Sequence, residues 1–213
     1  MPPSDGTVSG RATIPVMQPV FESVETFTIE EFERFVDERE AQGDIHHYEL
    51  LHGRIVMNPP AGWPHGLSEG RFVSRLEVFV SQRQLGYVFG SSQGFVFPSG
   101  DVVEPDGSFV SQARWKAAPA PEEGKFLRVV PDLIAEIVSP GKLWRDRGEK
   151  LGIYERNHVL EYWLIEPLPR RITVWNAGPE GRFAAPRTAG ADEPISSAIL
   201  EGLTVRLSDL LST

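Results

Sequence analysis

The sequence contains no cysteine in its 213 residues. This absence excludes disulfide bonds, thiolate zinc sites and cysteine nucleophiles. No apolar run approaches the ~18 residues that a membrane-spanning helix requires, and the first residues lack the apolar stretch of a secretory signal. We therefore expect a globular protein of the cytoplasm that has no membrane partner.

Several motifs of well-defined chemistry are also missing. The sequence has no glycine-rich dinucleotide fingerprint, no phosphate-binding P-loop and no serine-nucleophile elbow. No two of its histidines have the HxH or HxxxH spacing that suits zinc. His65, near the start of a predicted helix, is expected to have a structural role at that helix N-terminus.

Basic residues are outnumbered, at 21 against 30 acidic residues, so the formal net charge is −9. This balance argues against a protein that coats nucleic acid through a basic surface. Most of the acidic excess lies between Glu22 and Glu49. Between Lys142 and Arg156 the basic residues outnumber the acidic ones, so a locally basic cleft remains open.

The proportions of hydrophobic residues (40%) and charged residues (24%) are typical of a globular chain. Residues 1–24 are rich in proline, serine and glycine and predict a flexible N-terminal tail, whereas residues 25–213 predict one domain. Apolar periodicity predicts helices at 28–43, 65–83, 142–156 and 207–211, and strands at 48–51, 54–57, 86–89, 94–97, 104–110, 132–138, 161–165 and 172–175. A polar connector is expected at 111–130. These elements indicate the α/β (mixed α+β) class.

Glu136 lies in the strongest strand pattern, at 132–138. Side chains alternate along a strand, and both faces of this strand are apolar except at Glu136. A carboxylate is rarely buried without a partner, because its desolvation costs several kcal/mol. Glu136 therefore has to meet a cation, which is a metal ion, an arginine or a lysine. A purely structural ion pair also fits this segment.

The helix predicted at 142–156 offers such a cation. At about 100° per residue, Arg147 falls within the apolar stripe of this helix and Lys150 falls at its edge. Both side chains are therefore directed toward the core, where an acid such as Glu136 would hold them. The alternative for Lys150 is a bridge to Asp146 on the solvent side.

Two further acids, Asp106 and Glu49, interrupt strand patterns. The alternative for Asp106 is a turn at Asp106–Gly107, and the alternative for Glu49 is a solvated edge position. Three acids and one lysine on a sheet flanked by helices suit a phosphodiester hydrolase, because carboxylates bind Mg²⁺ or Mn²⁺ and a lysine steadies the transition state. Paired acids also serve glycoside hydrolases, whose activity would survive a chelator.

Four segments, taken in order, resemble the Uma family of putative restriction endonucleases. They are 48–60 (YELLHGRIVMNPP), 104–106 (EPD), 131–140 (PDLIAEIVSP) and 161–165 (EYWLI), with His65, Asp146, Lys150 and Tyr154 between them. The resemblance runs from about Phe27 to about Leu207. It implies membership of the PD-(D/E)XK nuclease superfamily, whose restriction-endonuclease-like core is a mixed β-sheet flanked by helices.

Carried over by position, the resemblance implies that Asp106 and Glu136 bind Mg²⁺ or Mn²⁺, and that Glu49 is an accessory metal ligand or a water-positioning acid. The superfamily lysine follows the second acid by two positions, where this chain has Val138. The resemblance implies that Lys150, from the following helix, replaces that lysine and stabilises the transition state. The predicted catalytic residues are thus Glu49, Asp106, Glu136 and Lys150.

The activity implied by the resemblance is that of a metal-dependent endonuclease, which hydrolyses DNA phosphodiester bonds with an activated water and forms a homodimer to cut two strands. The cations expected to engage phosphate are Lys142, Arg145, Arg147 and Lys150, with Arg114, Lys116, Lys125 and Arg128 of the connector. The alternative is a catalytically inactive dimeric nucleic-acid-binding or regulatory module on the same fold. Metal binding distinguishes the two, because an inactive site is expected to keep a lysine or arginine ion pair in its place.

Overall fold

The computed structural model describes residues 21–58, 62–138 and 145–211, without the side chains of residues 145 and 146. Its larger sheet has the strand order β11-β10-β9-β8-β7-β4. These strands are β4 (Gly86–Gly90), β7 (Gly107–Ser111), β8 (Leu133–Ile137), β9 (Glu161–Glu166), β10 (Arg171–Asn176) and β11 (Arg187–Gly190). The pair β8–β9 is parallel and the other neighbours are antiparallel, so the predicted mixed sheet is confirmed.

The parallel pair depends on the crossover between β8 and β9. The described part of that crossover is a π-helical segment, η1 (Arg145–Lys150), followed by α4 (Leu151–Arg156). Parallel neighbours require such a connection, because the chain has to return to the starting edge of the sheet. The crossover therefore returns the segment with Lys150 to the sheet that contains Glu136.

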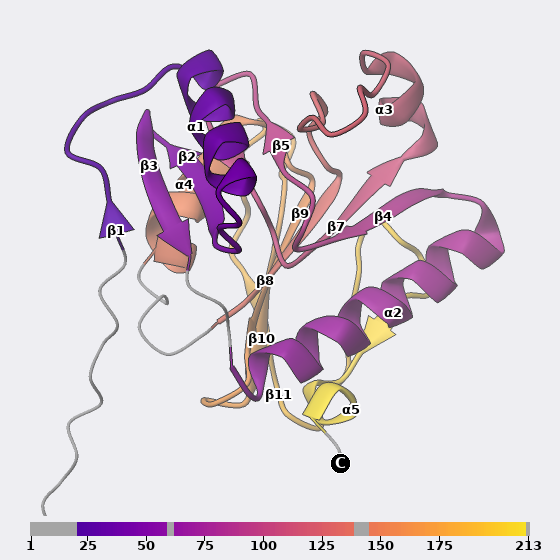
Figure 1. The fold of residues 1–213 in the computed structure, drawn as a ribbon. Coiled ribbons are helices and arrows are strands. Elements are labelled where there is room, and N and C mark those ends of the chain that lie inside the picture. The colour runs from indigo at the N-terminus through magenta and orange to yellow at the C-terminus, as the bar shows by residue number, and fades with distance from the viewer. Residues whose placement is uncertain (1–20, 59–61, 139–144, 212–213) are drawn as a thin grey trace, which may run out of the picture.

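One face of the larger sheet is covered by α2 (His65–Arg83), with α5 (Leu207–Leu211) beside it (Figure 1). The buried Phe72, Leu76 and Val80 recur at helical spacing along α2 and pack on apolar side chains of β7, β8, β9 and β10. The sequence predicted both helices with these bounds. This face is mainly apolar, with the buried Glu161 accepting a hydrogen bond from the indole of Trp163, and it forms the largest of the three core clusters.

The other face of the larger sheet is covered by α4 and by a five-stranded sheet of order β1-β3-β2-β6-β5. These strands are β1 (Phe21–Glu22), β2 (His47–Leu51), β3 (Arg54–Asn58), β5 (Phe95–Val96) and β6 (Val102–Val103). Helix α1 (Ile29–Ala41) packs on the outer face of this smaller sheet (Figure 1). It begins with a capping box between Thr28 and Glu31.

Strand β2 divides its side chains between these two layers. Tyr48 and Leu50 pack toward α1, in the cluster that contains Phe32, whereas Leu51 packs in the cluster shared with the larger sheet. Because side chains alternate along a strand, Glu49 shares the face of Leu51. The carboxylate of Glu49 therefore points into the layer between the two sheets.

The structure differs from the predicted elements in several places, including the described start of the helix predicted at 142–156, which is the π-helical η1. Of the predicted tail, residues 1–20 lie outside the described residues, but Phe21 and Glu22 form β1 on the edge of β3. The connector at 111–130 contains a short helix, α3 (Gln112–Ala117), with Ser111 as its N-cap. The strand expected at 104–110 begins only at Gly107, so residues 104–106 form a loop. A hairpin of β12 (Ile195–Ser196) and β13 (Thr204–Val205) completes the described strands.

None of the helices in the described ranges combines the length and the apolar character needed to cross a membrane.

We expect Phe72→Ala to lower the free energy of unfolding by about 3–5 kcal/mol, because it empties a site in the core between α2 and the larger sheet. Phe72 is 1% exposed and its ring packs on that of Trp163, with the centroids 5.9 Å apart. Urea unfolding followed by far-UV circular dichroism measures the change. The matched control is Val78→Ala on the same helix, where the side chain is 52% exposed and the cost should stay within about 0.5 kcal/mol.

Candidate functional site

A buried lysine joins the two sheets. Lys150 Nζ lies 2.8 Å from Oε1 of Glu136 and 2.9 Å from Oε1 of Glu49, and all three residues are at most 4% exposed. Glu136 comes from β8 of the larger sheet and Glu49 from β2 of the smaller one. The predicted contact between Lys150 and Glu136 is therefore confirmed, although this contact alone does not test a catalytic role.

Tyr154 reinforces this contact. Its hydroxyl donates a hydrogen bond to the same oxygen of Glu136 that Lys150 contacts. Residues four apart lie on one side of a helical segment, so Lys150 at the end of η1 and Tyr154 in α4 face β8 together. Glu136 is thus held by two donors from the crossover that follows its own strand.

Glu49 is fully buried, so the alternative of a solvated edge position is wrong. Besides the ammonium of Lys150, its Oε1 accepts a hydrogen bond from the backbone N–H of Glu104 (2.9 Å), and its Oε2 accepts one from Asn58 Nδ2 (2.8 Å). A buried carboxylate needs such donors to offset its lost hydration. Glu49 therefore ties the loop at 104–106 to the ion pair of Lys150.

Asp106 lies at the end of that loop, directly before β7. Its Oδ2 accepts a hydrogen bond from the backbone N–H of Ile137 (2.6 Å) and lies 3.1 Å from Nε2 of His65. In the register of β7 with β8, Gly107 pairs with Ala135, which brings the start of β7 beside the end of β8. Asp106 therefore neighbours the residue that follows Glu136.

Asp106 and two neighbouring side chains form a donor set suited to a divalent cation. One ligand atom each from His65, Glu69 and Asp106 can be chosen so that all lie within 4.8 Å of one another. Carboxylate oxygens suit Mg²⁺ and Mn²⁺, and imidazole suits the transition metals, so Mn²⁺ accepts both kinds of donor. The residues present fit the cation that the sequence predicts.

This donor set overlaps only in part with the predicted ligands. Asp106 belongs to both, whereas Glu49 and Glu136 contact Lys150 instead. Sequence reasoning gave His65 a structural role and did not consider Glu69. The sequence signal that could have identified them is the spacing of four residues between His65 and Glu69. In the first turns of α2 this spacing puts an imidazole and a carboxylate on one side of the helix.

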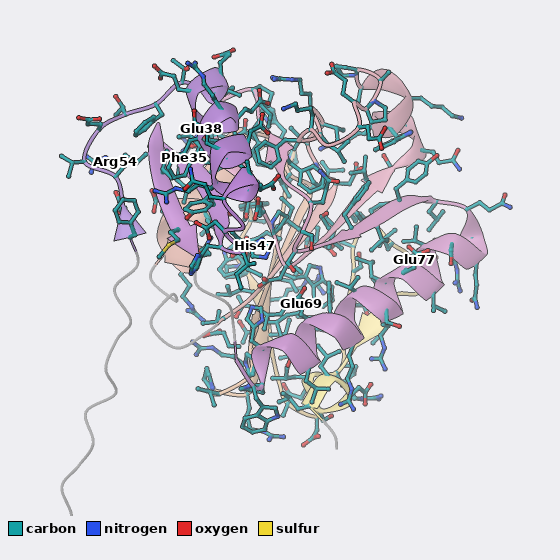
Figure 2. All side chains as sticks on the ribbon, viewed as in Figure 1. Phe35, Glu38, His47, Arg54, Glu69 and Glu77 are labelled. Carbon is teal, nitrogen blue, oxygen red and sulfur yellow. The ribbon has the colours of Figure 1, made fainter. Side chains whose placement is uncertain are left out.

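His47 and Glu104 form a second pair that sequence reasoning missed. His47 Nδ1 lies 2.8 Å from Oε2 of Glu104. Burial raises the pKa of Glu104, and the hydrogen bond to Glu104 raises the pKa of His47 above its ordinary 6.5. The carboxylates of Glu69 and Asp106 also act on His47. Figure 2 shows His47 and Glu69, which come from the smaller sheet and from α2.

Most of the described cations that the sequence assigned to phosphate are ion-paired with carboxylates of the chain. The pairs other than those of Lys150 are Arg114–Asp132, Lys125–Asp37, Arg128–Glu33 and Arg147–Glu166. Lys142 and the side chain of Arg145 lie outside the described part of the chain. The connector that contains Arg114, Lys125 and Arg128 is thus bound to the protein itself, and its contact with DNA stays a prediction.

Comparison with known proteins bears on the family and the fold of the chain. The family model Uma2, described as a putative restriction endonuclease, matches residues 29–208. The fold is similar to the crystal structure of a putative nuclease belonging to DUF820 from Anabaena variabilis, with a TM-score of 0.68 and 19% sequence identity. That similarity covers 87% of this chain and 98% of the other, and at this identity it shows the fold alone. No match is found among curated proteins.

Replacing Lys150 by methionine is expected to lower the free energy of unfolding by about 3–5 kcal/mol, because it leaves two buried carboxylates without their cation. Chemical unfolding at neutral pH measures the loss. The double variant Lys150→Met/Glu49→Gln removes one of the two charges as well, so it should recover part of the stability. Equal stability of Lys150→Met and the wild type would show that the acids do not depend on Lys150.

Glu104→Gln is expected to destabilise the protein more at about pH 6 than at about pH 8. The raised pKa of His47 means that its protonated form is favoured in the folded state. The stabilisation from the contact of protonated His47 with Glu104 is fully present below pH 6.5, the ordinary pKa of histidine. It is lost as the pH rises through the raised pKa that His47 has in the folded protein. Urea unfolding of both proteins across this range measures the difference.

The raised pKa of Glu104 also makes the folded protein less stable as the pH rises. The unfolded chain releases this proton near 4.5, before the folded chain does, so the wild type loses stability as the pH rises. Glutamine has no proton to release and removes this dependence. A stability difference that is constant or grows with pH would contradict the pairing of His47 with Glu104.

Proposed function

Because the chain belongs to the Uma2 family of putative restriction endonucleases, we propose that it is a metal-dependent endonuclease that hydrolyses phosphodiester bonds in DNA. The observation that carries this proposal is the position of Lys150 between the buried carboxylates of Glu49 and Glu136, where the residue after Glu136 donates its backbone N–H to Asp106 of the donor set. The sequence lacks the family lysine two positions after Glu136, and Lys150 supplies an ammonium at that carboxylate from the crossover.

In the proposed site, Asp106 is the central ligand of a Mg²⁺ or Mn²⁺ ion, with donors from His65 and Glu69. We propose Glu136 as a further ligand because the residue that follows it donates its backbone N–H to Asp106. When bound, such a cation polarises the phosphate and activates a water for attack on phosphorus. Lys150 and Tyr154 hold the carboxylate of Glu136 in place through hydrogen bonds to its Oε1. The backbone N–H of Ile137 fixes the orientation of the Asp106 carboxylate.

Lys150 donates hydrogen bonds to the phosphate oxygens as negative charge develops on them. Glu49 orients Lys150 for this role and is itself held by the backbone of Glu104 and by Asn58. Glu49 is thus an accessory acid that acts through Lys150. An ammonium that is already positioned loses little entropy when the transition state forms.

The same ion pair is the observation that favours a second candidate, a dimeric nucleic-acid-binding or regulatory module without cleavage. In such a module Lys150 would neutralise Glu136 and Glu49 permanently, and no divalent cation would be held. Calorimetric titration with Mn²⁺ distinguishes the two candidates. The nuclease should bind Mn²⁺ and lose this binding in Asp106→Asn, whereas the module should not bind it in either form.

The proposal also covers the oligomeric state, the domain and the cellular compartment of the protein. Cleavage of both strands of a duplex requires two active sites, so we propose a symmetric homodimer of this chain. We also propose that residues 25–213 form one domain and that the protein acts in the cytoplasm.

The wild type is expected to nick supercoiled plasmid at low salt with Mg²⁺ or Mn²⁺ and to stop when a chelator is added. Asp106→Asn, Glu136→Ala and Lys150→Ala should each lower the rate at least about 100-fold, since even supporting residues of a metal site are worth 10–100-fold. Agarose electrophoresis of the plasmid forms measures the rate. Val78→Ala, on an exposed part of α2, is the control and should cleave like the wild type.

The pattern of losses separates the roles of these residues. Loss in Asp106→Asn and Glu136→Ala with full activity in Lys150→Ala would leave the metal site and remove the role of Lys150. Activity that persists in the presence of the chelator would contradict metal dependence. Absence of cleavage by the wild type, together with absence of Mn²⁺ binding, would establish the binding module.

A further inference from the structure

Trp63 is an exposed tryptophan next to the proposed active site. It lies in the turn before α2 and is 81% exposed. A single exposed apolar side chain needs no explanation in itself, so its position decides whether it has a role. Its Cα lies within ~7 Å of that of His65, because two peptide units separate them. Nε2 of His65 is 3.1 Å from Asp106.

The charges of the chain favour a contact with the substrate that does not depend on charge. Nine of the lysines and arginines in the described ranges are ion-paired with carboxylates. The formal net charge is −9, so the field of the whole chain opposes a polyanion. Duplex DNA is held mainly through neutralised phosphates, and half of the 18 lysines and arginines whose side chains the structure describes are already paired with acids of the chain.

Stacking of a base on an aromatic ring does not depend on charge. In single-stranded nucleic acid the faces of the bases are accessible, and aromatic side chains of single-strand binders use them. In a duplex both faces of each base are covered by its neighbours. An exposed indole beside the catalytic cluster therefore favours a substrate with unpaired bases.

We propose that Trp63 is a stacking platform for an unpaired base next to the scissile phosphate, and that the substrate class is single-stranded or locally unpaired DNA. This inference rests on the proposed nuclease function and specifies its substrate. Trp63 contributes to binding and to the choice of substrate, whereas the chemistry belongs to Asp106, Glu136 and Lys150.

The test measures binding separately from cleavage. Fluorescence anisotropy in EDTA follows a labelled oligothymidylate of about 12 nucleotides, a length within the ~4–16 that single-strand-binding folds cover. We expect Trp63→Ala to raise the Kd about five- to 150-fold, which corresponds to the worth of one stacked base. Trp63→Phe keeps an aromatic ring and should lose less. Val78→Ala is the control and should bind like the wild type, and thermal unfolding should show all variants folded.

An abasic oligonucleotide of the same length tests the stacking directly, because it retains the phosphates and lacks the bases. The wild type should bind it as weakly as Trp63→Ala binds oligothymidylate, and Trp63→Ala should bind both alike. The slope of log Kd against log salt should be the same for the wild type and Trp63→Ala, because stacking releases no counterions. A duplex of the same length should bind the wild type more weakly than oligothymidylate does.

Each result bears on one of the two proposals. Unchanged affinity in Trp63→Ala, equal binding of abasic and normal oligomers, or no binding of oligothymidylate by the wild type would overturn the stacking platform. If Trp63 proves necessary for binding while the plasmid is never nicked, the platform stands and the nuclease proposal fails. If the plasmid is nicked equally by the wild type and Trp63→Ala and binding is unchanged, the nuclease stands and the platform fails.

Discussion

The contact of Lys150 with two buried carboxylates determines how the layers of this protein are joined. Glu136 belongs to the larger sheet, Glu49 to the smaller sheet and Lys150 to the crossover between β8 and β9. Each charge has been removed from water, so the two carboxylates depend on Lys150 for compensation and Lys150 depends on them. The three segments can therefore hold their charges only in one relative position. In the proposed mechanism, the ammonium of this contact is also the one that stabilises the transition state.

The loop at 104–106 shows how this constraint extends to the donor set around Asp106. The backbone of Glu104 donates to Glu49, its carboxylate contacts His47, and Asp106 follows two residues later. Asp106 is fixed in turn by the backbone of Ile137, next to Glu136. The acids of the site thus share donors from two sheets. A change at one of them alters the orientation of the others.

The sequence predicted local features well, because their signals are local. The apolar spacing of α2, the pattern of β8 and the need of Glu136 for a cation were all confirmed, and the helical phase of Lys150 directed it to the correct side. His65 could not be assigned in this way, since its contact with Asp106 joins residues 41 positions apart. The cations of the connector looked available for phosphate because their acidic partners, such as Asp37, are remote in sequence.

The alternation along β2 has a consequence for how this family can vary. Tyr48 and Leu50 face α1 while Glu49 faces the layer between the sheets, and the strand has only five residues. Inserting or deleting one residue within it would exchange the two faces. A carboxylate would then enter the apolar contact with α1, and an apolar side chain would replace it beside Lys150. The turn at His52–Gly53, where two residues with positive φ reverse the chain, therefore sets the register of β2 with β3 and with it the face on which Glu49 lies.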